Sequence, residues 1–366
     1  MMNFKDLMQP HLQDVKPYVP GKPIEELKRE KSHLEEIIKL ASNENPYPPV
    51  EEVKKAIIRE LDQLNRYPNS GSYYLTRELA EFYSLDNNQL FVGNGSNEII
   101  DLLVRAFVNP HDHIVYPFPS FIVYPIETQL AGVKATEVPL QDYRLDLPAM
   151  KNSITNNTKM IFICNPNNPT GTYVSRAEVE TFLDGLRPDI FVVFDEAYYE
   201  YVVADDYPDT LDLARTRSNL IILRTFSKIH SLAGLRIGYM IAAEEIVTCL
   251  HKVRQPFNVN RIAQIAARES LRHMDKIETR VRENREQMVY VREELEKLGF
   301  TVPPSQTNFL LVVPPPGCGD IREKITDHGI IVRGMRPFGY SDEVFRVTVG
   351  TPEENLKFVG ALKKLL

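Results

Sequence analysis

Residues 225–239 read TFSKIHSLAGLRIGY. They follow an apolar segment, 220–223, and run into a second one, 235–243, and we predict that both segments form β-strands. A lysine just past a buried strand can be partly desolvated, which lowers its pKa and makes its amine a nucleophile. The stretch therefore predicts a reactive amine at Lys228, at one end of a sheet.

The other polar residues of this stretch indicate what the amine would act on. The hydroxyls of Thr225 and Ser227 and the guanidinium of Arg236 suit a phosphate dianion. A nucleophilic amine beside a phosphate site is what pyridoxal phosphate requires, because its aldehyde forms a Schiff base with a lysine. Taken alone, the stretch also fits an ordinary loop with a solvated Lys228 and Arg236.

Apolar strands alternate with helices through the first two thirds of the chain. The predicted strands cover 90–92, 113–116, 133–138, 159–164, 190–194 and 220–223, and the intervening helices cover 99–104, 121–130 and 177–186. This alternation predicts a parallel sheet covered by helices on both faces. Asn168, Asp195 and Lys228 each lie at or just beyond the end of a predicted strand. Because ligands of such sheets bind outside the carboxyl ends of the strands, we expect these residues in one site.

A glycine-bearing turn, residues 93–98 (GNGSNE), follows the first of these strands and opens an apolar helix. Backbone N–H groups at such a helix start form a ready phosphate site. No Gly-Lys-Ser/Thr follows, so the turn is not a Walker motif, and it is not a full dinucleotide-binding fingerprint. A purely structural cap is the alternative interpretation.

The pattern changes along the chain and predicts three parts. Residues 1–45 form a proline-bearing arm that packs on the small domain or on a partner subunit, 46–258 form a large domain, and 259–366 form a smaller α+β domain. Further helices are predicted at 50–64, 73–83, 244–252, 261–272, 275–298, 320–327 and 353–365, and further strands at 307–313, 330–332 and 345–349.

Composition narrows the class of protein. A hydrophobic content of 43% and a charged content of 25% are ordinary for a globular protein. The net charge of −7, without long basic runs, disfavours nucleic acid as a partner. No apolar run reaches the roughly 20 residues that span a membrane, and the first residues do not follow a signal-peptide pattern. Cys164, Cys249 and Cys318 lack metal-ligand and redox spacing, so we expect reduced thiols, no metal site and a cytoplasmic location.

Several motifs together resemble one family of enzymes. They are NENP at 43–46, RYP at 66–68, NPTG at 168–171, DEAY at 195–198, SK at 227–228, GLRIGY at 234–239 and RVTVGT at 346–351. Over nearly its whole length the chain resembles the fold-type-I pyridoxal-phosphate-dependent aminotransferases. Within them it looks most like the histidinol-phosphate aminotransferases.

The resemblance implies a role for each residue around the cofactor ring. Lys228 would hold the cofactor as a Schiff base and, once released by substrate, act as general base and acid at the substrate Cα. Asp195 would pair with the pyridine N–H, so that the ring stays protonated and accepts electrons. Asn168 and Tyr198 would hydrogen-bond the ring oxygen, and Phe121 would stack on the ring face.

The resemblance also implies how phosphate and substrate are bound. The phosphate would be held by Ser96, Asn97, Thr225, Ser227 and Arg236. Tyr67 would reach the phosphate from the neighbouring subunit, which implies a homodimer. Arg346 would bind the carboxylate of glutamate in one half-reaction and the phosphate of histidinol phosphate in the other, with help from Tyr18, Asn43, Asn168 and Arg333.

The implied reaction is ping-pong transfer of the amino group of L-histidinol phosphate to 2-oxoglutarate, giving imidazole-acetol phosphate and L-glutamate in histidine biosynthesis. Aromatic amino acid transamination and threonine-phosphate decarboxylation are the alternatives on this scaffold. A pyridoxal-phosphate-binding regulator would need an appended DNA-binding module, for which the short N-terminal arm leaves no room. An inactive relative is disfavoured because Lys228, Asp195 and Arg236 occur together.

The chain departs from the family pattern at a few positions. Asn97 stands where an aspartate is frequent, Phe121 stands where a tyrosine is frequent, and residues 229–231 (IHS) follow the lysine in place of small or aromatic residues. None of these changes removes the core chemistry. His230, within that segment, is expected to be structural.

Overall fold

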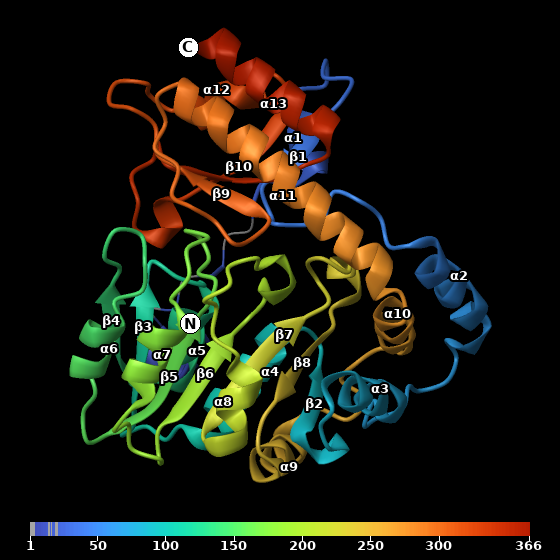
Figure 1. Cartoon of the computed structure of the whole chain (residues 1–366), viewed down its shortest axis with the longest axis vertical. Coiled ribbons are helices and arrows are strands. Elements are labelled where there is room, and N and C mark those ends of the chain that lie inside the picture. The colour runs from blue at the N-terminus through green and yellow to red at the C-terminus, as the bar shows by residue number, and fades with distance from the viewer. Residues whose placement is uncertain (1–3, 14, 16, 19–20) are drawn as a thin grey trace.

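The computed structural model describes residues 4–13, 15, 17–18 and 21–366. The structure has two sheets, one below the other in Figure 1, and a long helix, α11 (Met274–Lys297), extends from one to the other. The seven-stranded sheet comes from the middle of the chain, and the four-stranded sheet combines C-terminal strands with one N-terminal strand.

The large sheet has the strand order β2-β8-β7-β6-β5-β3-β4. Its strands are β2 (Leu90–Gly93), β3 (His113–Phe118), β4 (Lys134–Pro139), β5 (Thr158–Cys164), β6 (Phe191–Asp195), β7 (Leu220–Thr225) and β8 (Gly238–Ile241). Within this sheet only β8 runs against its neighbours, and every other neighbouring pair is parallel.

Helices cover both faces of this sheet. On β5, Phe162 packs with the helices α4 (Ser96–Phe107), α5 (Val123–Ala131) and α9 (Glu244–Val253). The next residue, Ile163, packs on the other face with α6 (Leu147–Asn152) and α7 (Arg176–Leu183). Because both faces are buried, the inner strands β5, β6 and β7 are apolar at most positions, whereas the edge strand β4 is mostly exposed. The predicted α/β fold with a mostly parallel, doubly covered sheet is confirmed.

Further helices flank the large sheet. They are α2 (Glu51–Glu60), α3 (Tyr73–Tyr83), α8 (Thr210–Thr216) and α10 (Arg261–Leu271). Helices α2, α3 and α10 share a core with the sheet residues Ile222 and Ile241.

The small sheet has the order β1-β10-β11-β9, with β1 (Ile38–Leu40), β9 (Phe309–Val312), β10 (Ile330–Gly334) and β11 (Phe345–Thr348). Strand β1 pairs in parallel with β10, so a segment far upstream in the chain becomes an edge of the C-terminal sheet. Helices α11, α12 (Ile321–Thr326) and α13 (Pro352–Leu365) bury its apolar residues. The short helix α1 (Ile24–Glu30) packs Leu27 against β10.

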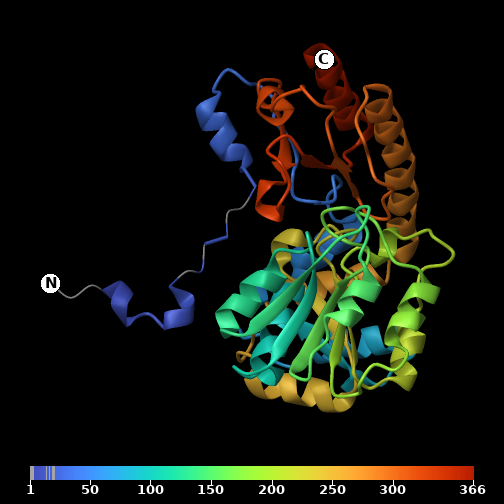
Figure 2. The ribbon, with the colours of Figure 1, turned by 90° about the vertical axis from the view of Figure 1, so that its left-hand side faces the viewer.

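The N-terminal segment begins with two 3-10 turns, Phe4–Leu7 and Pro10–Leu12, and Figure 2 shows it to one side of the body. His11 of the second turn lies within hydrogen-bond distance, 3.2 Å, of the carbonyl oxygen of Leu130 at the end of α5. Residues 1–3, 14, 16, 19 and 20 of the predicted arm lie outside the described residues.

The structure differs from the predicted elements in two ways. Helices α1, α6 and α8, of six or seven residues, were not predicted, because so short a helix shows little helical periodicity. The strand predicted to start at 235 starts at Gly238, because Ala233–Leu235 forms a 3-10 turn and Arg236 adopts a positive φ of 57°. The other 3-10 turns are Leu61–Gln63, Asn87–Gln89, Tyr199–Tyr201 and Arg336–Phe338.

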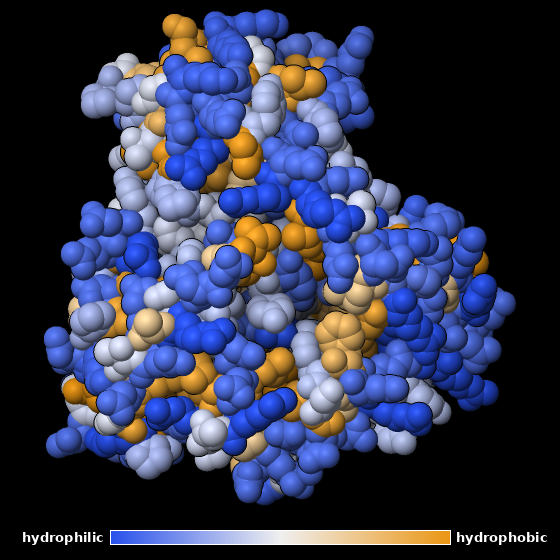
Figure 3. All heavy atoms as spheres, in the orientation of Figure 1, coloured by the Kyte–Doolittle hydropathy of each residue, from blue (hydrophilic) through white to orange (hydrophobic). Residues whose placement is uncertain are grey.

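Within the described part of the chain, every helix is too short or too polar to cross a membrane. The face drawn in Figure 3 carries hydrophilic residues over most of its area, with smaller apolar areas between them.

Candidate active site

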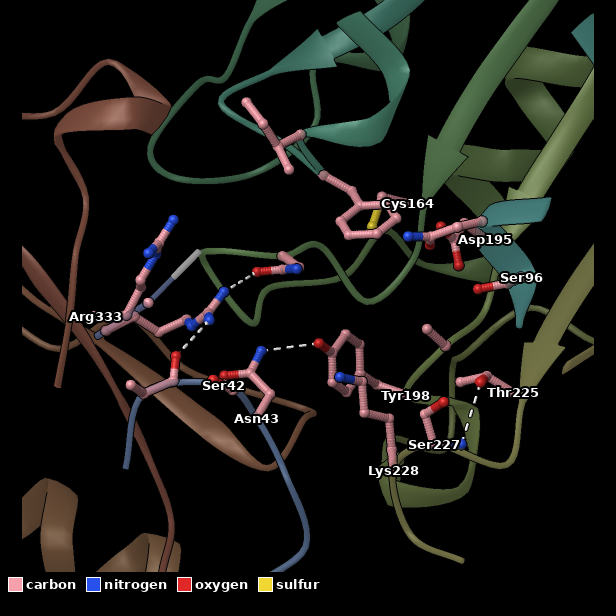
Figure 4. Close-up of a pocket in the computed structure, with 18 of the residues that line it drawn as sticks. Ser42, Asn43, Ser96, Cys164, Asp195, Tyr198, Thr225, Ser227, Lys228 and Arg333 are labelled. Atoms are coloured by element: carbon pink, nitrogen blue, oxygen red, sulfur yellow. Dashed lines mark hydrogen bonds between the residues drawn. The ribbon is translucent and has the colours of Figure 1, made fainter. Parts of the chain in front are cut away.

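A cavity of about 220 Å³ lies where the carboxyl ends of the large sheet's strands face the small sheet. Figure 4 shows its lining residues pointing inward from both sheets. All the site residues predicted from the sequence except Tyr67 line it: Tyr18, Asn43, Ser96, Asn97, Phe121, Asn168, Asp195, Tyr198, Thr225, Ser227, Lys228, Arg236, Arg333 and Arg346. Residues almost 330 positions apart in the sequence are thus brought to one place. Their individual roles stay predictions.

Lys228 lies in the loop after β7, with its side chain in the cavity. Burial lowers the pKa of Lys228 from 10.5 to about 8, and the nearby charges of Arg346 and Arg236 act in the same direction. Its Nζ lies 5.5 Å from the centroid of the Tyr198 ring. At pH 7 about a tenth of such an amine is neutral, whereas a lysine in water is almost fully charged. The structure therefore favours a nucleophilic amine at this position.

Asp195 is the last residue of β6 and is fully buried. Its Oδ2 accepts a hydrogen bond of 2.8 Å from the Tyr124 hydroxyl, while its Oδ1 has no hydrogen-bond partner among the described residues. Burial raises the pKa of Asp195 to about 6, and the Tyr124 hydroxyl, the Ala197 amide and Lys228 oppose that shift. A buried carboxylate oxygen without a partner fits a cofactor that presents an N–H, as the pyridinium ring of pyridoxal phosphate does.

The start of α4 borders the cavity with groups that suit an anion. Gly95 precedes the helix with φ of 81°, and a Cβ built on it would lie 2.6 Å from Nη2 of Arg236. A Cβ on Gly238 would lie 2.7 Å from the backbone nitrogen of Ser96. Both glycines therefore let Arg236 and β8 approach the helix start closely. Backbone N–H groups, a guanidinium and the helix dipole together suit a phosphate group.

The hydroxyls predicted to bind phosphate come from the loop after β7. The Thr225 hydroxyl donates to the carbonyl of Ile237 at 3.2 Å and accepts from the backbone N–H of Ser227 at 3.1 Å. These bonds fold the loop so that both side chains line the cavity. The residues around the cavity thus fit both the ring and the phosphate of pyridoxal phosphate.

Asn43 and Tyr198 meet between the two sheets. The Asn43 amide donates to the Tyr198 hydroxyl at 2.8 Å, and its backbone N–H donates to the Thr348 hydroxyl at 2.9 Å. Asn43 has a φ of 53°, a left-handed conformation that asparagine tolerates better than most residues. Burial raises the pKa of Tyr198, so that its phenol stays protonated and can donate.

Two arginines lie directly opposite each other on neighbouring strands, Arg333 on β10 and Arg346 on β11. Arg346 is buried; it donates to Oδ1 of Asn168 and, at 3.1 Å, to the carbonyl of Ala41. Its Nε has no partner among the described residues. Burial lowers the pKa of Arg346 to about 10, and the charge of Arg333 adds to that shift. Two guanidinium groups that line one cavity suit a carboxylate or phosphate group.

Tyr67 lies away from the cavity. It is 78% exposed, and its ring stacks on Phe257 with a centroid distance of 4.5 Å. His230 is also outside the set of described lining residues; its Nδ1 lies 2.8 Å from the Ser270 hydroxyl, and its ring packs against Phe226.

The sequence interpretation missed several residues at the site. Cys164, Ile122 and Phe338 line the cavity, and Tyr124 contacts Asp195. Cys164 ends β5 beside Asp195 in the pairing register, a signal that strand alignment could have supplied. Burial raises the pKa of its thiol to about 12, so the thiol stays protonated at neutral pH. No group of His, Cys, Asp and Glu among the described residues could hold a metal ion.

The cavity at one end of the parallel sheet has the features of pyridoxal-phosphate-dependent transaminases. They are a desolvated lysine, a buried aspartate with one oxygen lacking a hydrogen-bond partner, a helix start that suits a phosphate group, and a pair of arginines. The chain belongs to the aminotransferase class I and II family, whose sequence pattern matches residues 35–362. It is therefore an enzyme, and pyridoxal phosphate is its cofactor.

Proteins of known name are similar to this chain over almost all of it. It is 41% identical over 363 residues to histidinol-phosphate aminotransferase 2 of Hydrogenovibrio crunogenus, covering 99% of this chain and 97% of that protein. It is 42% identical to histidinol-phosphate aminotransferase of Moorella thermoacetica, covering 96% and 91%. The crystal structure of histidinol-phosphate aminotransferase from Sinorhizobium meliloti, solved with pyridoxal 5'-phosphate, superimposes with a TM-score of 0.88 at 24% identity, covering 98% and 97%. Because the identity to the Sinorhizobium meliloti structure is only 24%, that similarity supports the fold alone.

Proposed function

We propose that this enzyme transfers the amino group of L-histidinol phosphate to 2-oxoglutarate, giving imidazole-acetol phosphate and L-glutamate, as a step of histidine biosynthesis. The relatives named above carry this activity in their names at 41% and 42% identity. The observation that carries the proposal is the opposed pair Arg333 and Arg346 in the same cavity as Lys228.

The substrates explain why one arginine pair serves both half-reactions. In histidinol phosphate, the phosphate ester is on the carbon bonded to the amine-bearing carbon. In glutamate, the α-carboxylate is bonded to the amine-bearing carbon and so takes the corresponding position. Arginine binds either anion through two parallel N–H groups. Because Arg346 is held by Asn168 and by the carbonyl of Ala41, its guanidinium is already oriented before an anion arrives.

The residues around Lys228 support transamination. When bound, pyridoxal phosphate supplies an aldehyde that condenses with primary amines and a ring that accepts electrons from the activated carbon. Lys228, with its lowered pKa, can take a proton from the substrate Cα and return it to the adjacent cofactor carbon. Asp195 would offer Oδ1 to the ring N–H, and Tyr198 and Asn168, which line the cavity from two different loops, would hydrogen-bond the ring oxygen.

The two half-reactions test the proposal separately. The purified protein is loaded with pyridoxal phosphate, and its visible spectrum is recorded after L-histidinol phosphate is added without any oxo acid. We expect the visible band to disappear and 2-oxoglutarate to restore it. A band that ignores histidinol phosphate and responds to phenylalanine or tyrosine would instead support an aromatic amino acid aminotransferase. Release of carbon dioxide from threonine phosphate would support the decarboxylase alternative.

The proposal includes a homodimer in which Tyr67 serves the neighbouring site. Tyr67 is exposed, as are Phe257, on which its ring stacks, and several apolar residues on and near α2 and α3. These apolar residues are Ile58, Leu61, Leu64, Tyr73, Tyr74 and Phe82. Such a concentration of aromatic side chains is typical of subunit interfaces. Sedimentation at micromolar concentration would distinguish a dimer from a monomer.

A cytoplasmic location is the last part of the proposal. The reaction belongs to amino-acid biosynthesis, and Cys164, Cys249 and Cys318 are free thiols, as is usual in a reducing compartment. Fractionation of cells that express the tagged chain would test the location, and recovery outside the cytoplasmic fraction would contradict it.

A further inference from the structure

The two carboxylate oxygens of Asp195 have different surroundings. Oδ2 accepts the 2.8 Å hydrogen bond from the Tyr124 hydroxyl, and Oδ1 is buried without a partner among the described residues. Asp195 lines the cavity, whereas Tyr124 lies behind it, outside the set of described lining residues. One oxygen is thus already used by the protein, and one is left for a group that enters the cavity.

Tyr124 is held in place on several sides. It lies in the first turn of α5 and is fully buried. Its ring stacks on Phe162 of β5 with a centroid distance of 4.6 Å and an interplanar angle of 11°. It also contacts the ring of Phe121, edge to face at 5.7 Å and 84°. The hydroxyl therefore has a fixed position relative to the end of β6, and Phe121 shares the same support.

The protonation states of the pair fit a donor and an acceptor. Burial raises the pKa of Tyr124 well above its usual range, so the phenol keeps its proton and can only donate to a carboxylate oxygen. Burial also raises the pKa of Asp195, and the hydrogen bond from Tyr124 opposes that change. A donated hydrogen bond stabilises the ionised carboxylate over the neutral acid. The phenol thus acts on both the charge and the orientation of Asp195.

We propose that Tyr124 is a positioning residue for the cofactor: its hydroxyl fixes Oδ2 of Asp195, so that the carboxylate stays ionised and Oδ1 faces the pyridine N–H. The same side chain supports Phe121, so that one residue behind the cavity aligns the groups at the edge and at the face of the ring. This inference rests on the proposed function, because it needs a bound pyridine ring.

Tyr124→Phe removes the hydroxyl and keeps the stacked ring. Tyr116→Phe is a matched control, because the Tyr116 hydroxyl also donates at 2.8 Å to a carboxylate, that of Glu137 on β4. Tyr116 is buried on β3, with its ring centroid 6.4 Å from that of Tyr124. Each variant loses one phenol-to-carboxylate hydrogen bond, but only Tyr124→Phe loses the bond to Asp195.

The first readout is cofactor binding by the cofactor-free protein. A hydrogen bond to a charged group contributes enough that we expect the dissociation constant for pyridoxal phosphate to rise about 10-fold or more in Tyr124→Phe.

The second readout is the pH titration of the visible band. A less ionised Asp195 makes the pyridine ring less positive. The Schiff-base proton, whose loss changes the visible band, is then held more tightly. We therefore expect the midpoint of the titration to move up by about one pH unit. Tyr116→Phe should match the wild type in both.

A double mutant tests whether Tyr124 acts through Asp195. In Asp195→Ala neither the charge nor the acceptor of the Tyr124 hydroxyl remains, so adding Tyr124→Phe should change the cofactor dissociation constant by less than about 2-fold. If the two substitutions have independent effects on cofactor binding, the hydroxyl acts by another route and the inference is wrong.

Other outcomes also decide the matter. Equal changes in Tyr124→Phe and Tyr116→Phe, or wild-type binding and titration in Tyr124→Phe, would overturn the inference. So would a Tyr124→Phe protein that fails to fold while Tyr116→Phe folds, because the hydroxyl would then be required for stability. If the wild-type protein forms no visible band or does not respond to histidinol phosphate, the proposed function fails. If the wild type responds to histidinol phosphate but Tyr124→Phe binds the cofactor and titrates like the wild type, only the inference about Tyr124 is wrong.

Discussion

Arg346 donates a hydrogen bond to Oδ1 of Asn168, and this contact joins β11 of the small sheet to the turn after β5 of the large sheet. The residue predicted to bind the substrate anion is thus tied to a residue predicted to touch the cofactor. A change at Arg346 should therefore affect substrate binding and the alignment of the two sheets at the site.

The first prediction concerns Arg346→Lys. Lysine keeps the charge but loses the planar pair of N–H groups, so we expect kcat/KM to fall about 100-fold in both half-reactions. The measurement is the single-turnover rate with histidinol phosphate and, separately, with glutamate. Arg336→Lys is the control, because Arg336 is exposed and pairs only loosely with Asp342 at 3.5 Å. A loss confined to one half-reaction would mean that the two anions bind to different residues.

The second prediction concerns Lys228 and pH in the cofactor-free protein. Folding lowers the pKa of Lys228 from 10.5 to about 8, so below pH 8 the folded state holds a buried charge at a cost of about 3 kcal/mol. Between these two pKa values the unfolded state binds the extra proton, so stability rises with pH. Lys228→Met should therefore be more stable than the wild type at pH 7, and this advantage should shrink between pH 8 and 10.5.

Chemical unfolding of both cofactor-free proteins at pH 7 and pH 10 measures this difference. Lys252→Met, at an exposed position of α9, serves as the control and should leave stability nearly unchanged. A stability difference between Lys228→Met and wild type that is the same at both pH values would contradict the lowered pKa. The same Lys228→Met protein should have no measurable transamination, because the amine that moves the proton is absent.

The long apolar strands could be predicted from the sequence because burial on both faces leaves a local pattern. That pattern located the ends of β5, β6 and β7, and with them Asn168, Asp195 and Lys228. Contacts between distant segments leave no such pattern. Tyr124 lies 71 residues before Asp195, and its role depends on how α5 packs against β6. The pairing of β1 with β10 is equally invisible to local periodicity.

The third prediction concerns Gly95. Its φ of 81° and the 2.6 Å approach of Arg236 leave no room for a Cβ. Gly95→Ala should therefore displace the guanidinium and raise the dissociation constant for pyridoxal phosphate about 10-fold. Gly234→Ala lies two residues from Arg236, where a Cβ would meet nothing within 4 Å, and should bind like the wild type. Titration of the cofactor-free proteins measures both, and equal affinities would show that Arg236 does not depend on Gly95.

The fourth prediction concerns a buried ion pair next to the site. Arg224 Nη2 lies 2.8 Å from the Glu196 carboxylate, and both side chains are buried. Arg224→Met leaves the Glu196 carboxylate buried without its cation, so we expect the free energy of unfolding to fall by about 3–5 kcal/mol. Adding Glu196→Gln should recover part of the loss, because neither member of the pair then carries a buried charge. In contrast, Arg144→Met, which breaks the more exposed pair with Glu178, should cost less than about 1 kcal/mol. Urea unfolding measures all three variants, and equal losses for the two arginine variants would contradict the argument from burial.

The last prediction tests whether Tyr67 crosses to the neighbouring subunit. Lys228→Ala and Tyr67→Ala each damage one component of every site in a homodimer, so each protein alone should have low activity. In a mixed dimer, one site receives both damaged residues, while the other combines Lys228 from one subunit with Tyr67 from its partner and is intact. Co-expression with two different affinity tags isolates the mixed dimer, and we expect about half of the wild-type activity per dimer. If Tyr67 served its own subunit's site, every site would hold one damaged residue and activity would not return. Its 78% exposure in the single chain, with a ring stacked on Phe257, is what a side chain supplied to a partner requires.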